Sequence, residues 1–146
     1  MKQPLYLGFY GRSNTGKTNL ITALIKHFTA QDYKVATIKQ TSHHYSIDSA
    51  GKDTFKHADA GADLVCFQSA IETSFILKQK ISFQKIKQIM ECFDCYDIVL
   101  VEGANEASIQ KIRISDTIPL RENTVFTFTG DINKVIMFIQ QQIKRS

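Results

Sequence analysis

The sequence contains little cysteine and no long apolar run. Its three cysteines, Cys66, Cys92 and Cys95, are too few for a disulfide framework, and their odd number leaves at least one free thiol. The apolar run near the start stops at Gly11, so it is too short to span a membrane, and it lacks the small-residue cleavage site of a secretion signal. We therefore expect a protein of a reducing compartment, the cytoplasm, with no membrane partner.

Repeats, linkers and low-complexity segments are absent as well. The 146 residues include 43% apolar and 22% charged residues, which is close to the globular average and excludes disordered and fibrous chains. A chain of this length can bury a sizeable core without disulfide support. We therefore expect a single domain over residues 1–146.

Basic residues are in excess, but they form no block. Lysine and arginine number 18 against 14 acidic residues, which gives a net charge of +4 and a pI near 9.0. Scattered positive charge suits a small anionic ligand at least as well as a polyanion. Because the chain also lacks an aromatic and basic recognition motif, nucleic acid is not an expected partner.

Apolar runs alternate with amphipathic stretches along most of the chain. Strands are expected at residues 5–10, 34–39, 64–68, 73–78, 98–102, 111–115 and 124–128, the third and fourth of these as a hairpin. Helices are expected at 19–30 and 52–61, after Ser82, and after Asp131. This alternation predicts an α/β protein with a mainly parallel sheet and helices on both faces.

Residues 11–18 form the most informative motif. They read Gly-Arg-Ser-Asn-Thr-Gly-Lys-Thr and match G-x-x-x-x-G-K-[ST], the phosphate loop or Walker A motif. A chance match is the alternative, and it would occur in roughly one chain in two hundred of this size. Because a predicted strand directly precedes the motif and an amphipathic helix directly follows it, we expect a three-layer P-loop NTPase fold.

Each part of the motif has a chemical role in binding phosphate. Glycine lets the backbone curl so that successive N–H groups face inward, and the helix adds its positive end. The lysine supplies charge to the β- and γ-phosphates, and the hydroxyl after it can ligate Mg²⁺. The candidate contacts are Gly11, Arg12, Ser13, Asn14, Thr15, Gly16, Lys17 and Thr18.

Such a loop needs an acidic group at the end of a neighbouring strand. Glu102 ends the apolar run 98–102, where ligands bind in open α/β sheets. Asp97 begins the same run and should lie at the opposite edge. We therefore favour Glu102 over Asp97 as the group that holds magnesium with Thr18; the alternative for Glu102 is a solvated strand end.

Other polar residues allow two interpretations. Lys39, His43, His44, Asp48 and Asp53 lie in or beside the polar segment 40–51, which either contacts substrate or magnesium or is simply solvated. Adjacent histidines generally point apart, which argues against one metal held by both. Cys92 and Cys95 form a lone C-x-x-C pair, which we interpret as ordinary packing or surface cysteines, since no second pair completes a zinc site.

The residues alone leave the base and the reaction open. Asn133 and Lys134 are followed by Val135 and Ile136, so the Asn-Lys-x-Asp guanine reader is absent. A small-molecule kinase is an alternative, with an acceptor near His43 or Asp53 and charge neutralised by Lys39. A scarcity of arginine and the lack of an arginine-rich lid count against it.

Motifs in one order along nearly the whole chain resemble the MobB family. They are the phosphate loop, residues 38–44 (Ile-Lys-Gln-Thr-Ser-His-His), Asp48, residues 51–53 (Gly-Lys-Asp), His57, residues 60–62 (Ala-Gly-Ala) and residues 101–103 (Val-Glu-Gly). The chain departs from the family pattern at Gln40, at Ala104-Asn105 and at Gln110, where the family has histidine, an aromatic residue with lysine, and proline.

The resemblance implies a GTP-binding adapter in molybdenum cofactor biosynthesis. Such proteins assist the guanylyltransferase MobA in attaching GMP to molybdopterin, bind GTP with Mg²⁺, hydrolyse it weakly and are typically homodimers. Phosphate and magnesium contacts carry over to Gly11, Gly16, Lys17 and Thr18, and the acidic partner to Glu102. The resemblance also implies that Lys39, His43, His44, Asp48 and Asp53 belong to a functional loop.

Overall fold

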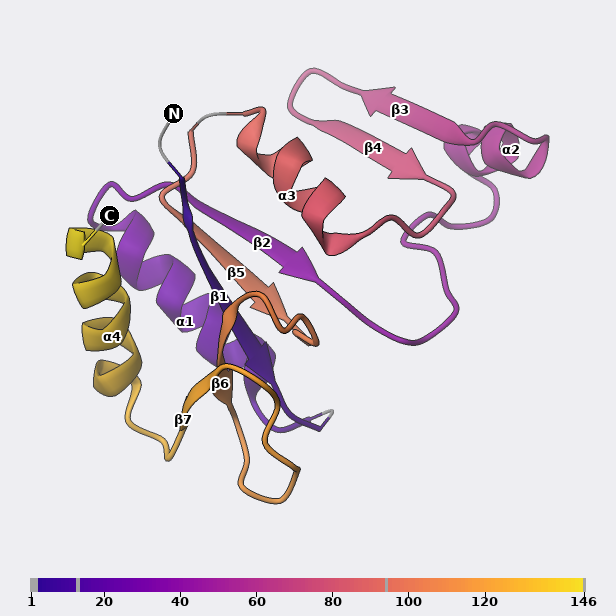
Figure 1. The fold of residues 1–146 in the computed structure, drawn as a ribbon. Coiled ribbons are helices and arrows are strands. Elements are labelled where there is room, and N and C mark those ends of the chain that lie inside the picture. Colours follow the sequence, from indigo (N-terminus) through magenta and orange to yellow (C-terminus); the bar gives the residue numbers. More distant parts are fainter. Residues whose placement is uncertain (1–2, 13, 94, 146) are drawn as a thin grey trace. The chain divides into compact units, whose positions relative to one another are not determined.

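The computed structural model describes residues 3–12, 14–93 and 95–145, and the chain divides into two compact units (Figure 1). The sheet unit comprises Met1–Thr41 and Lys87–Ser146, and the hairpin unit comprises Ser42–Ile86. In the described part of the chain, no helix combines the length and apolarity that crossing a membrane requires.

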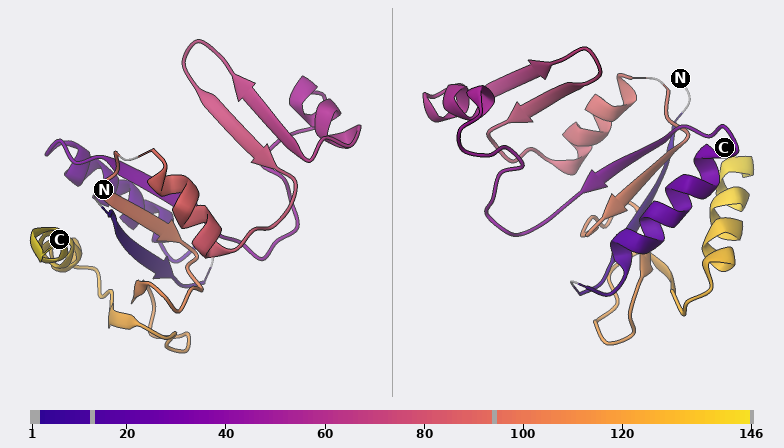
Figure 2. Two further views of the ribbon diagram at one scale, coloured as in Figure 1. Left: turned by 45° about the horizontal axis from the view of Figure 1, so that its top comes forward. Right: turned by 180° about the vertical axis from the view of Figure 1, so that it is seen from behind.

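Five parallel strands form the sheet of the sheet unit. In chain order they are β1 (Leu5–Tyr10), β2 (Val35–Lys39), β5 (Ile98–Glu102), β6 (Gln110–Arg113) and β7 (Thr124–Thr127). Their order across the sheet is β2-β5-β1-β6-β7, so β1 is central. Because all pairings are parallel, the carboxyl ends of the strands meet at one edge, and the loop after β1 leaves the sheet there (Figure 2).

Two helices cover one face of this sheet. Alternate β1 residues, Leu7 and Phe9, are fully buried against α1 (Lys17–Thr29) and α4 (Ile132–Arg145). The apolar stripe of α1 includes Leu24 and Phe28, and that of α4 includes Val135 and Ile139; burying each such side chain stabilises the fold by roughly 1.5–3 kcal/mol.

The opposite face of β1 carries Tyr6, and the second half of α3 (Phe83–Glu91) lies against it. The Nζ atom of Lys87 is 4.8 Å from the centroid of the Tyr6 ring. Ser82 begins α3 as expected, because its Oγ accepts a hydrogen bond of 3.2 Å from the Lys85 N–H. Helices therefore lie on both faces of the sheet, and the predicted α/β fold is confirmed.

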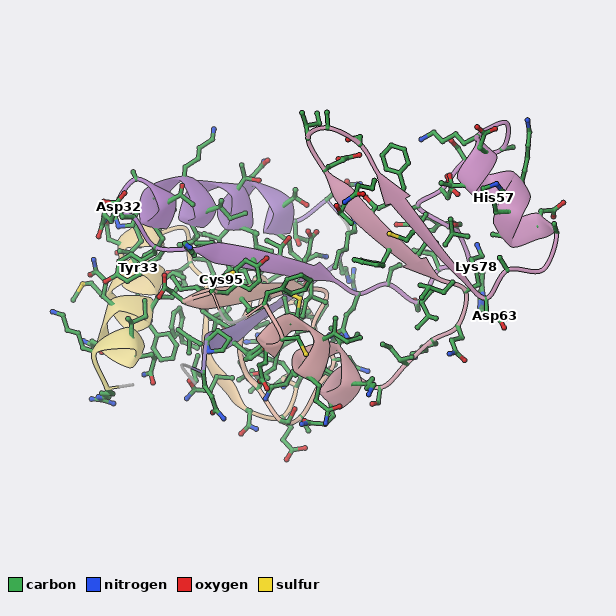
Figure 3. The ribbon with its side chains drawn as sticks, turned by 90° about the horizontal axis from the view of Figure 1, so that it is seen from above. Asp32, Tyr33, His57, Asp63, Lys78 and Cys95 are labelled. Carbon is green, nitrogen blue, oxygen red and sulfur yellow. The ribbon has the colours of Figure 1, made fainter. Side chains whose placement is uncertain are left out.

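The hairpin unit holds α2 (Asp53–Asp59) and the antiparallel strands β3 (Leu64–Gln68) and β4 (Thr73–Leu77). Helix α2, which carries His57, contacts β3, whose Val65 is buried. At the open end of the hairpin, the Lys78 N–H donates to the Asp63 carbonyl at 2.9 Å (Figure 3). The predicted hairpin is thus confirmed, while the predicted single domain over 1–146 stays a prediction.

Candidate functional site

The phosphate loop connects the central strand β1 to α1. Gly16 precedes the helix with φ of 86° and, as glycine, offers no side chain to cap it. Asn14 is also left-handed, with φ of 61°, so the backbone curls sharply between strand and helix. The first N–H groups of α1 consequently remain available to an anion. Ser13, a predicted contact, lies outside the described residues.

Lys17 folds back over the loop. Its Nζ atom donates to the carbonyl oxygens of Gly11 at 2.6 Å and Arg12 at 2.9 Å. Burial lowers the pKa of Lys17 below its ordinary value of 10.5; the charges of Arg121 and Lys39 lower it further, and Glu102 opposes the change. The ammonium is therefore partly desolvated and held by weak neutral acceptors, a state in which phosphate oxygens would be better partners.

Thr18 and Glu102 meet, as the sequence predicts. The Thr18 hydroxyl donates to Glu102 Oε1 at 2.8 Å, because Phe9 in β1 pairs with Glu102 at the end of β5. Among the described residues no group of three or more histidines, cysteines or acids could hold a metal. Magnesium at phosphate sites needs one or two protein oxygens, with phosphate and water completing the shell, and this pair fits that requirement.

Asp97 lies at the opposite edge of the sheet, which confirms its predicted placement. Its carbonyl accepts from the Leu5 N–H at 2.9 Å, and its Oδ2 accepts from the Lys34 N–H at 2.7 Å. These bonds tie the starts of β1, β2 and β5 together. Asp97 therefore has a structural role at the amino ends of these strands. Thr18 lies at the opposite edge of the sheet, where the strands have their carboxyl ends.

Lys39 is brought to the phosphate-loop edge, whereas the other predicted loop residues belong to the hairpin unit. Lys39 ends β2 in register with Glu102, and its charge acts on Lys17. In the hairpin unit, Asp48 Oδ1 accepts from the Ser49 N–H at 3.0 Å. His43 and His44 are exposed on the segment before it.

Local bonds involve both predicted aspartates of the hairpin unit, although among the described residues Asp48 Oδ2 is buried without a hydrogen-bond partner. Asp48 Oδ1 also accepts from the Thr54 hydroxyl at 3.1 Å, which holds the turn before α2. Asp53 begins α2, and its Oδ1 is 3.9 Å from Lys56 Nζ. The ligand-binding role of His43, His44, Asp48 and Asp53 stays a prediction.

Sequence reasoning missed Arg121, which lies between β6 and β7. Its Cζ atom is 4.6 Å from the centroid of the Tyr10 ring, and its Nη1 donates to the Ala104 carbonyl. The Arg121 N–H donates to the Tyr10 hydroxyl at 2.9 Å. An isolated arginine in a connecting loop belongs to no motif, so only the three-dimensional pairing places it beside the residue that precedes Gly11.

The cysteines are as expected from their number. Cys66, Cys92 and Cys95 are free and exposed. Their exposure agrees with interpreting the C-x-x-C pair as surface cysteines.

Comparison with known proteins identifies one family along most of the chain. The family model "Molybdopterin guanine dinucleotide synthesis protein B" (MobB) matches residues 6–139. The molybdopterin-guanine dinucleotide biosynthesis adapter protein of Haemophilus influenzae is 33% identical over 108 residues, which are 73% of this chain and 60% of that protein. The corresponding adapter protein of Escherichia coli is 33% identical over 110 residues, 73% of this chain and 62% of that protein.

The fold is similar to that of solved structures. A crystal structure of Bacillus subtilis MobB has a TM-score of 0.72 at 18% identity, and the match covers 94% of this chain and 97% of that one. The parallel sheet and its helices are therefore an arrangement already seen in a solved protein, although the matched region spans only about three fifths of the two adapter proteins.

Proposed function

Since the chain belongs to the MobB family, we propose that it is a GTP-binding adapter in the synthesis of molybdopterin guanine dinucleotide and that it assists a MobA-type guanylyltransferase. The observation that carries this proposal is the curled loop at residues 11–18, with Lys17 folded over it and Thr18 bonded to Glu102. The names of the relatives support the pathway. Cytoplasmic location is part of the same proposal.

Different groups of the loop would bind different parts of Mg·GTP. Backbone N–H groups from Thr15 to Thr18 would donate to phosphate oxygens, helped by the positive end of α1. Lys17 would exchange its bonds to the Gly11 and Arg12 carbonyls for bonds to the β- and γ-phosphates. Thr18 and Glu102 would hold Mg²⁺, which neutralises phosphate charge.

Weak hydrolysis of GTP would depend on the same residues. Lys17 would stabilise the negative charge that develops on the transferred phosphoryl group, and Glu102 would help to hold Mg²⁺. A small-molecule kinase is not favoured, because the family and its named relatives are biosynthesis adapters. A kinase would also need to bind an acceptor, for which Asp53 was a candidate contact. The Asp53 carboxylate instead pairs with Lys56.

The hairpin unit supports a homodimer as part of the proposal. Leu64, Phe75 and Leu77 share one face of the hairpin and are 55%, 64% and 36% exposed. A two-stranded ribbon is marginally stable by itself, and a cluster of exposed apolar side chains is typical of an interface. We propose that a second copy of this chain covers that face.

Competitive binding tests the function directly. GTP, ATP and GMP would be titrated with Mg²⁺ against a fluorescent GTP analogue, with the guanylyltransferase absent and then present. We expect GTP to compete best and the adapter to raise the rate at which the guanylyltransferase forms the dinucleotide. Equal competition by ATP, together with no effect on that rate, would contradict the proposal.

A further inference from the structure

We propose that Arg121 binds the terminal phosphate of the nucleotide and makes the chain prefer a nucleoside triphosphate over a diphosphate. This inference rests on the proposed nucleotide site, and it adds a residue that neither the phosphate-loop motif nor the family pattern quoted above contains. It is drawn from the position, the free donors and the fixed orientation of the guanidinium group.

The position of Arg121 is set by the two segments that frame the phosphate loop. Its guanidinium stacks on Tyr10, the last residue of β1 and the neighbour of Gly11. Its Nη1 donates to the carbonyl of Ala104, two residues after Glu102. The β6–β7 connection and the phosphate loop leave the sheet at the same edge (Figures 1 and 2). The contacts with Tyr10 and Ala104 place Arg121 beside the start of the phosphate loop.

The neighbours of Arg121 identify which end of the nucleotide it would meet. In this motif the lysine reaches the β- and γ-phosphates. Thr18 and Glu102 are the pair that would hold the metal, and Ala104 lies two residues after Glu102. Arg121 also acts electrostatically on Lys17. These contacts favour the terminal phosphate as the part of the nucleotide that the guanidinium would meet.

The guanidinium retains donors for an anion. Arginine has five N–H donors in a planar fork, and within the part of the chain that the structure describes Arg121 forms no ion pair with a carboxylate. The charges of Lys39 and Arg121 act on Lys17 together with the opposite charge of Glu102, while Glu122 and Glu106 act with Arg121 on Lys111. Phosphate oxygens match the geometry of the guanidinium fork.

Buried contacts fix the turn that carries Arg121 before any ligand binds. Lys111 is 1% exposed, and its Nζ atom donates to the carbonyls of Ile109 at 3.0 Å and Glu122 at 2.7 Å. The Lys111 N–H donates to the Asn123 carbonyl at 2.9 Å. Arg121 therefore needs little reordering to bind, which favours affinity. Lys111 is in this sense a positioning residue.

The test compares GTP with GDP in the 146-residue chain by calorimetry with Mg²⁺. Arg121→Gln should lower the affinity for GTP by on the order of tenfold and that for GDP by less than about threefold, because only GTP has the terminal phosphate. Arg121→Lys should fall between these values, since it keeps the charge and loses the fork. Arg145→Gln, at the exposed end of α4, is the control and should change neither affinity.

The outcomes separate this inference from the proposed function. An equal loss for GTP and GDP, or no loss for either, would overturn the role of Arg121 and leave the nucleotide site standing. If the unaltered chain bound neither nucleotide, the proposed function would fail and this inference with it. A GTP-selective loss with unchanged thermal stability supports the inference.

Discussion

Gly103 joins the carboxyl ends of β1, β2 and β5 at the site. Its φ is 78°, and its N–H donates to the Phe9 carbonyl at 2.8 Å. A Cβ atom at this position would lie 2.4 Å from the carbonyl oxygen of Gln40. Both the left-handed backbone and the close approach therefore require glycine directly after Glu102.

Replacing Gly103 should destabilise the sheet unit more than replacing a glycine that has space around it. Gly130 has φ of 100° and no heavy atom within 4 Å of an added Cβ, so Gly130→Ala carries backbone strain of roughly 1–2 kcal/mol alone. Gly103→Ala adds overpacking of roughly 1–3 kcal/mol. Urea unfolding of both variants measures this difference, and equal free energies of unfolding would contradict the close approach to Gln40.

Tyr6 should make stability fall in strong alkali. Burial, with a smaller contribution from the charge of Glu91, raises the pKa of Tyr6 from 10.0 to about 12. A phenol with a raised folded-state pKa stabilises the fold below pH 10, and this contribution disappears as the pH rises from 10 through about 12. The full effect is on the order of 2–3 kcal/mol.

Comparing the chain with its Tyr6→Phe variant isolates that effect from the titration of lysines, which both share. We expect the free energy of unfolding to decline less steeply between pH 10 and 12 in the variant. In an ultraviolet titration, the variant should show one fewer tyrosine that ionises at high pH. Identical slopes would show that the Tyr6 hydroxyl ionises as freely in the folded chain as in the unfolded one.

Single residues differ in how far the sequence could identify them. Lys17, Thr18 and Glu102 were predictable, because a fixed spacing and a strand end define them, and the Thr18–Glu102 hydrogen bond brings the second and third together. Arg121 was not, because its place depends on contact with Tyr10, which lies 111 residues earlier in the chain. The burial of Lys111 was equally hidden, since its two acceptors are loop carbonyls.

At the scale of elements, a side-chain cap fixes the start of α4. The Oδ1 atom of Asp131 accepts from the Asn133 N–H at 3.0 Å at the start of α4, as expected from the sequence. This helix places Val135 and Ile139 in the core. Its first turn therefore matters to the packing of the sheet, and the cap also offers its negative charge to the positive end of the helix.

Asp131→Ala should lower the free energy of unfolding by about 1 kcal/mol, because it leaves a first-turn N–H without its acceptor. Asp131→Asn should restore most of the loss, since asparagine caps almost as well. Asp116→Ala, at an exposed position after β6, serves as the control and should be near neutral. Chemical denaturation measures the free energy of unfolding of each variant. A loss for Asp116→Ala as large as that for Asp131→Ala would contradict the cap.

Periodicity predicted the elements well, and their ends less well. The expected strand 111–115 is observed at Gln110–Arg113, and the expected strand 124–128 ends at Thr127. Pairing decides these ends: the register between β6 and β7 shifts at Lys111/Ile112. Such a shift depends on the partner strand, which hydrophobic patterning within one segment does not encode.

At the scale of the whole molecule, the composition predicted a globular chain but not its two compact units. The hairpin of residues 64–77 was visible in the sequence as two short apolar runs, whereas its exposed face was not. Phe75 and Leu64 occupy strand positions that look like core, and their 64% and 55% exposure emerges only once the packing of α2 on the other face is known.

Introducing charge on that face should separate the proposed homodimer. Phe75→Lys places an ammonium among apolar side chains that would otherwise be buried, which is costly at an interface core. We expect this variant to be monomeric in analytical ultracentrifugation at concentrations where the unaltered chain is dimeric. Met137→Lys, also at an exposed apolar position but in the sheet unit, should leave the dimer intact. Loss of the dimer in both variants would argue against a role for the hairpin.

The most direct test of the nucleotide site is the affinity for Mg·GTP of Lys17→Ala, measured by isothermal titration calorimetry beside Lys26→Ala. Lys26 is an exposed residue on the same helix, so its variant controls for charge. Lys17→Ala should bind at least about tenfold more weakly, since it removes a charged phosphate contact, while Lys26→Ala should match the unaltered chain and both should keep their melting temperatures. Unchanged affinity in Lys17→Ala would contradict the assignment of this loop as the triphosphate site.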